Sequence, residues 1–200
     1  MSGQLLALAL MLPRDGDLAT CEHQARLASR LGYSAVHIPK SRDAQLSEAE
    51  VTQLMSAAAP MSVITDDDDN DDDNDDDNQD DATIVRRNDP DLVRSTRAML
   101  TALGDERPVT VAVSLSIGRT RSEAMARADR DPRLVGAAHP QESGIFGTFE
   151  QAQQQVLELA QAGAQILLVT VPQELDIADV LAQVRALVVG ATPALFNDEN

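Results

Sequence analysis

The sequence predicts an α/β fold with parallel strands, a shortened or incomplete (β/α)8 barrel of the TIM type. Short apolar runs of strand length alternate along the chain with longer segments of helical periodicity, which is the order of a parallel sheet. Gly or Pro follows most of these segments, as expected where helices and strands end. The 200 residues, 43% of them hydrophobic, suffice for one core. Five strands and a weaker sixth can be counted, however, whereas a closed barrel needs eight. On spacing alone, an open doubly wound sheet is the other possibility.

The N-terminal part of the chain contains two strand–helix units. Gln4–Met11 (QLLALALM) is a continuous apolar run, typical of a strand buried on both faces. A helix over residues 18–31 follows and ends at Gly32, a residue that favours the left-handed conformation of a helix C-terminus. The next strand is predicted at Ser34–Ile38. Ser47 then opens a second helix, with Glu50 three residues later, as a capping box.

The middle of the chain is dominated by acidic residues. A short strand at Met61–Ile64 is followed by Asp66–Asp81, which holds 12 Asp, three Asn, one Gln and no basic residue. Such a tract cannot bury a core, because its like charges repel and Asp and Asn form helices and strands poorly. We expect a disordered acidic insertion here.

The C-terminal part contains the remaining units. Helices are predicted after the N-caps Asp89, Thr120, Thr148 and Asp176, the last of them through Val188. The predicted strands are Val109–Ile117, the short 144–146 segment, and Gln165–Thr170.

These elements divide the chain into four parts. Residues 1–65 and 83–190 are predicted to form the two halves of one domain, with the acidic tract at 66–82 and a flexible tail at 191–200.

Composition excludes several classes of partner. The net charge is −17, but outside the acidic tract only 21 acidic and 16 basic residues remain, a mildly acidic surface. This argues against nucleic acid and anionic membranes, which need basic patches. The apolar run Leu5–Leu12 is too short to span a membrane and lacks a basic residue before it. A single cysteine, Cys21, fits a reducing compartment, so a cytoplasmic location is expected.

Four segments have the order of helices and strands, and the residues at their ends, that are typical of one barrel family. They are Ala25–Pro39, Val51–Thr65, Val109–Ala128 and Gly144–Val171. The chain resembles the luciferase-like monooxygenase family in two features. One is a helix that ends in Gly-Tyr before a short strand, and the other is a strand-Gly-Thr-helix-Gly-strand series. In that family Phe149 would stand where proline is usual.

The resemblance implies a function and a cofactor. Members are flavin- or deazaflavin-dependent barrels, so it implies an oxidoreductase or monooxygenase that binds FMN or coenzyme F420 and a small organic substrate. Two departures stand against it: Lys40 and Ser41 occupy the place of an acidic residue and a histidine, and the acidic tract replaces the middle strands. The alternatives are a non-catalytic flavin-binding or oligomeric remnant of the family, and an acidic cation-binding or interaction module.

Five residues are the candidates for the site. Gly147 and Thr148 would lie at a helix start whose free N–H groups suit the FMN phosphate, with a plain N-cap as the alternative. Thr170 ends a strand at the face where barrels bind ligands. Arg14 follows the first strand at the same face. Its guanidinium would bind a phosphate there, or it is a surface charge. His37 alternates with apolar neighbours, so it is the candidate catalytic residue or a hydrogen-bonded core histidine.

No specific metal site is predicted. The acidic tract offers oxygen ligands, but no window in it has the glycine and glutamate that an EF-hand loop requires. If the barrel is incomplete, edge strands near the tract would be exposed, and an exposed edge favours pairing with another chain. A homodimer is therefore expected.

Overall fold

A computed structural model describes residues 6–13, 17–38, 46–65, 83–130, 144–171 and 176–196 of the chain. Arg14, Lys40, Ser41, the acidic tract and residues 131–143 therefore lie outside the described residues. None of the helices in these ranges is long and apolar enough to cross a membrane.

The fold is α/β with a parallel sheet, as the sequence predicts. Its strands are β1 (Ala7–Met11), β2 (Ala35–Ile38), β3 (Ser62–Thr65), β4 (Ile84–Val85), β5 (Thr110–Ile117), β6 (Gly144–Gly147) and β7 (Ile166–Thr170). The helices between and after them are α1 (Leu18–Arg30), α2 (Glu48–Ala58), α3 (Pro90–Ala102), α4 (Arg121–Ala128), α7 (Phe149–Gln161) and α8 (Ile177–Phe196).

The strand order is β3-β2-β1-β7-β5, and both β4 and β6 pair with the outer edge of β5. β4 pairs with the first half of that edge, at Thr110 and Val111, and β6 with the second half, from Ser114 to Ile117. No pairing joins β3 to β4 or β6 within the described residues, so the sheet is open there. This arrangement is compatible with a barrel that lacks part of its wall.

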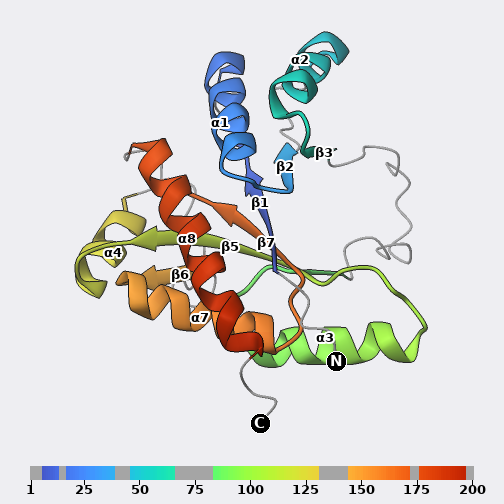
Figure 1. Cartoon of the computed structure of the whole chain (residues 1–200), viewed down its shortest axis with the longest axis vertical. Helices are drawn as coiled ribbons and strands as arrows, with labels where there is room; N and C mark the ends of the chain where they lie inside the picture. The colour runs from blue at the N-terminus through green and yellow to red at the C-terminus, as the bar shows by residue number, and fades with distance from the viewer. Residues whose placement is uncertain are drawn as a thin grey trace.

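One face of the sheet carries the main core. Alternate side chains of the central strands, such as Leu10, Val111 and Leu167, pack with α1, α2, α3, α7 and α8 in a single apolar cluster. Figure 1 shows α8 crossing in front of the sheet, with α1 above it and α7 below it. The other face of the central strands carries a smaller apolar cluster, formed by Ala9, Ala35 and Leu168.

Helix α4 lies on the face opposite to α7. In β6, Ile145 joins the main cluster, whereas the next residue, Phe146, packs with Met125 and Ala128 of α4. Because successive strand residues point to opposite faces, α4 and α7 cover different faces. Right-handed crossovers require this, since the chain moves outward from β5 to β6 and then back across β5 to β7.

The helix boundaries follow the predicted caps. Ser47 and Glu50 form a capping box at α2, and Asp89 accepts hydrogen bonds from two N–H groups of the first turn of α3. Gly32, Gly104 and Gly163 adopt positive φ after α1, α3 and α7.

Two boundaries differ from the prediction. Strand β4, of only two residues, is too short for a periodic pattern to reveal. Helix α8 continues to Phe196, so residues 191–196 of the expected flexible tail are helical. The helix continues through Gly190, which lies where α8 approaches α7. The Gln153 side chain of α7 occupies the position that a Cβ of residue 190 would take.

Tyr33 ties the start of β2 to α8. Its hydroxyl donates a buried hydrogen bond of 3.0 Å to the Leu181 carbonyl. Burial raises the pKa of Tyr33 well above its usual value, against a smaller opposite effect of the Arg185 guanidinium.

We expect Tyr33 to ionise only as the chain unfolds in alkali. Because the pKa is higher in the folded state, the phenol stabilises the fold below the ordinary pKa of 10.0, and this contribution is lost as the pH rises above it. Tyr33 is the only tyrosine and the chain has no tryptophan. Tyrosinate absorbance should therefore rise together with the loss of helical circular dichroism, and ionisation near pH 10 in a chain that keeps its helices would contradict the burial.

Replacement by alanine should change the unfolding free energy differently at two glycines. A Cβ at Gly144 would meet the Phe146 ring and lie 2.8 Å from the Ser114 carbonyl oxygen, which is backbone and cannot move aside. Gly144→Ala should cost about 2 kcal/mol of unfolding free energy. Gly190→Ala meets only the end of a flexible Gln153 side chain and should be neutral or stabilise by up to about 1 kcal/mol. Urea denaturation of both variants measures the difference, and equal effects would refute it.

Candidate functional site

A crevice opens at the carboxyl ends of β5 and β7, with a volume of about 510 Å³. One wall is formed by residues that follow β5 and by α4: Ile117, Gly118, Arg119, Glu123 and Arg127. The other wall is the first two turns of α8: Asp176, Asp179, Val180 and Gln183. We call this the β5–α8 crevice.

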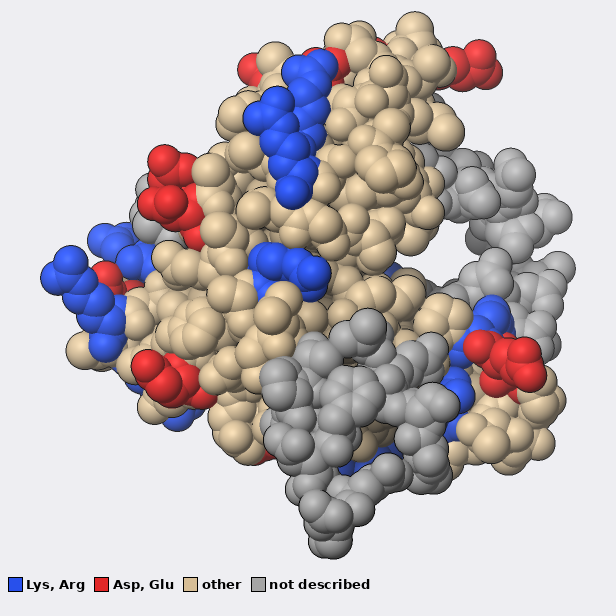
Figure 2. All heavy atoms as spheres, in the orientation of Figure 1, with Lys and Arg blue, Asp and Glu red and all other residues tan. Residues whose placement is uncertain are grey.

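The position of the crevice follows from the topology. After β5 the chain turns to α4 on one face of the sheet, and after β7 it turns to α8 on the other face. Neighbouring strands whose connections leave in opposite directions create a crevice at their carboxyl ends, where open α/β sheets bind ligands. Figure 1 shows α4 and the beginning of α8 on the same side of the molecule. Acidic and basic side chains gather at that margin in Figure 2.

The β5–α4 wall is held by a closed set of hydrogen bonds. The Gly118 N–H donates to the Gly147 carbonyl at 3.0 Å, which fixes the end of β5 against β6. Glu123 accepts from the Arg119 N–H at 3.0 Å and from the Arg127 guanidinium at 3.1 Å. Arg127 also donates to the Ile117 carbonyl at 2.6 Å. Glu123 and Arg127 therefore neutralise each other and make this wall rigid.

Gly118 allows α4 to start directly after the strand. A Cβ there would lie 2.8 Å from the Ala124 nitrogen and 2.9 Å from the Thr120 carbonyl oxygen, both backbone atoms. The close approach of this first turn needs a residue without a side chain.

The α8 wall presents one face of a helix. Asp176, Asp179, Val180 and Gln183 have the spacing i, i+3, i+4 and i+7. The Asp176 carboxylate accepts from the Ala178 N–H at 2.9 Å and so caps the helix. Asp179 and Gln183 are exposed and form no hydrogen bond or ion pair with another described residue. Both side chains border the crevice.

Gly147 and Thr148 serve the fold at the start of α7. Thr148 Oγ1 accepts from the Gln151 N–H, and Gln151 Oε1 accepts from the Thr148 N–H at 3.1 Å, a complete capping box. A Cβ at Gly147 would lie 2.6 Å from that same Gln151 oxygen. These contacts support the N-cap alternative, because the cap already engages the N–H groups that a phosphate would need.

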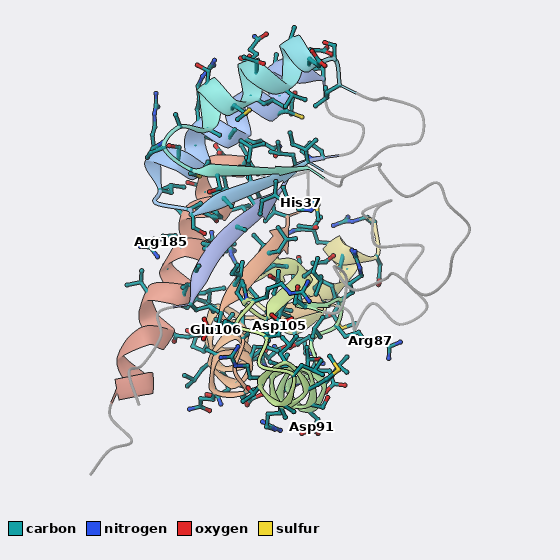
Figure 3. All side chains as sticks on the ribbon, turned by 90° about the vertical axis from the view of Figure 1, so that its right-hand side faces the viewer. His37, Arg87, Asp91, Asp105, Glu106 and Arg185 are labelled. Atoms are coloured by element: carbon teal, nitrogen blue, oxygen red, sulfur yellow. The ribbon has the colours of Figure 1, made fainter. Side chains whose placement is uncertain are left out.

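His37 and Thr170 lie on the other face of the sheet, near its carboxyl end. His37 is 8% exposed and pairs in register with Met11 on one side and Ile64 on the other. Thr170 pairs with Ser114. Strand β1 separates the two residues, so they do not come together, and neither lines the β5–α8 crevice. Figure 3 shows His37 at the strand ends, apart from the labelled acidic groups around α3.

A second, smaller hollow of about 450 Å³ lies beside the start of α7. Two of its lining residues serve the fold, since Gln151 belongs to the capping box and Gln155 accepts a 2.6 Å hydrogen bond from Asn88. The pKa of Glu150 is lowered there by its own backbone N–H and by the Thr148 hydroxyl. Within the described ranges no three His, Cys, Asp or Glu side chains gather as a metal site would require.

Sequence reasoning missed the crevice residues because each has an ordinary local role. Thr120 and Asp176 were predicted as helix N-caps, and both cap their helices. The available signal was a charged residue in the segment that follows each of two strands, Arg119 after one and Asp176 after the other. That signal gains meaning only once β5 and β7 are known to be neighbours.

Comparison with known proteins gives no family for this chain. No family model matches it, and no curated protein matches it. Among solved structures, the crystal structure of (S)-3-O-geranylgeranylglyceryl phosphate synthase from Thermoplasma acidophilum, in complex with its substrate sn-glycerol-1-phosphate, is similar in part. The alignment has a TM-score of 0.42 and 12% identity and covers 94% of each chain. A likeness of this size transfers no function.

The expected membership in the luciferase-like monooxygenase family is therefore wrong. No family model matches the chain, that of the monooxygenases included. The oxidoreductase activity and the cofactors FMN and coenzyme F420, which rested on that resemblance alone, fall with it. The physical reason is visible at Gly147 and Thr148, because a strand-Gly-Thr-helix series is how α/β units in general end a strand and cap a helix.

The capping role of Thr148 can be measured. Thr148→Ala should lower the unfolding free energy by about 1 kcal/mol, since it removes the acceptor for a first-turn N–H. Thr148→Ser keeps the hydroxyl and should retain most of the stability. Urea denaturation compares them, and an alanine variant as stable as the wild type would rule out the cap.

Proposed function

We propose that this protein binds a small polar molecule in the β5–α8 crevice. The observation that carries the proposal is the location of charged side chains, without an ion-pair partner among the described residues, at the crevice between two strands whose connections diverge. Its volume of about 510 Å³ is within the range of small-molecule sites. The expectation of a small-molecule ligand is thus kept, while its expected chemistry changes.

The lining favours a polar ligand that is not a polyanion. Only Ile117 and Val180 among its described residues bear apolar side chains. Three carboxylates face two guanidinium groups, so the lining repels a polyanion. The starts of both flanking helices are also capped by Thr120 and Asp176, which occupy N–H groups that would otherwise suit a phosphate.

The same residues support binding more than covalent catalysis. No Ser, Thr, Cys, His or Lys is among the described lining residues, so the usual nucleophiles are not found in this part of the crevice. The Cys21 thiol lies in the core instead, where burial raises its pKa and leaves it protonated.

The test is a titration of the ¹⁵N-labelled full chain with four probes, followed by amide chemical shifts. The probes are L-lysine, D-glucose, glutarate and inorganic phosphate. At least one uncharged or ammonium-bearing probe should shift the amides of Gly118 and Arg119 saturably. Gln183→Trp, which fills the crevice from the exposed face of α8, should abolish these shifts.

Ala182→Trp is the matched control. Ala182 is the neighbouring exposed residue of α8 and does not line the crevice, so the ligand-induced shifts should persist in this variant. If no probe shifts these amides, or if the shifts survive in Gln183→Trp, the crevice is not a ligand site.

A further inference from the structure

The crevice separates opposite charges that have no ion-pair partner among the described residues. Arg119 stands on the β5–α4 wall, and its guanidinium forms no ion pair with another described residue. Asp179 stands on the α8 wall and likewise forms none. Both are exposed, and the space between the two walls keeps them apart.

The other charges of the lining do not alter this division. Glu123 and Arg127 belong to one wall and are paired with each other at 3.1 Å. Asp176 adds a second carboxylate to the α8 wall, one turn before Asp179. A molecule in the crevice therefore meets one cationic group on one side and two carboxylates on the other.

We infer that the ligand is a basic amino acid or a close relative, with one carboxylate and two ammonium groups; this inference rests on the proposed function. The guanidinium of Arg119 matches a carboxylate, to which it can donate two parallel hydrogen bonds. The carboxylates of Asp176 and Asp179 accept from the ammonium groups. Such a ligand carries a net charge of +1, which complements the net charge of −1 of the described lining.

The ligand class is tested with three probes that share a carbon chain. L-lysine carries all three groups, 1,5-diaminopentane lacks the carboxylate, and hexanoate lacks both ammonium groups. Dissociation constants from amide shifts at low ionic strength should rank L-lysine first, because it alone engages both walls.

Two variants separate the walls. Arg119→Gln should weaken L-lysine about fivefold, the effect of about one exposed ion pair, and leave 1,5-diaminopentane unchanged. Asp179→Asn should weaken both L-lysine and the diamine about fivefold. Arg130→Gln and Asp129→Asn, which remove exposed charges near the end of α4 outside the crevice, are the matched controls and should change neither.

The outcomes distinguish the inference from the proposed function. If Arg119→Gln weakens L-lysine and 1,5-diaminopentane equally, or if D-glucose binds more tightly than L-lysine, the ligand class is wrong while the crevice remains a binding site. If none of the probes shifts the crevice amides, both the class and the site are wrong.

Discussion

The handedness of the strand–helix–strand crossover is the constraint on which this structure depends. A right-handed connection places the helix on a face that is set by the direction in which the chain moves across the sheet. Every connection that moves toward the β3 edge therefore adds a helix to the main core. The step from β5 to β6 moves the other way, and its helix α4 lies on the opposite face.

The same constraint positions the crevice and leaves its chemistry open. Once α4 and α8 leave neighbouring strands toward different faces, a gap must exist between their first turns. The backbone then needs only Gly118 to make the turn and the Glu123–Arg127 pair to hold it. The Arg119 N–H takes part in the β5–α4 wall through Glu123, but the side chains of Arg119 and Asp179 form no ion pair with another described residue.

The sequence predicted the elements well because the signals that end helices are local. Ser47, Asp89 and Thr148 each satisfy N–H groups within their own helix, and Gly32 needs only its own φ. The same signals misled where a long-range contact overrides them. The last helix was expected only through Val188, yet α8 continues past Gly190, which lies where α7 packs against α8. Gly147 and Thr148 have the form of a cofactor site, yet they complete a cap.

The site could not be predicted because strand order is not a local property. The sequence of β6 contains no signal that this strand pairs with the outer edge of β5 and that β7 pairs with the inner edge. Without that order, Arg119 and Asp179 are charges 60 residues apart in the sequence, one in a turn and one in a helix. With it, they face one crevice. The crevice lies after the carboxyl ends of strands, where sites were expected, but Thr170 and His37 were placed by strand position alone, without knowledge of which connections diverge.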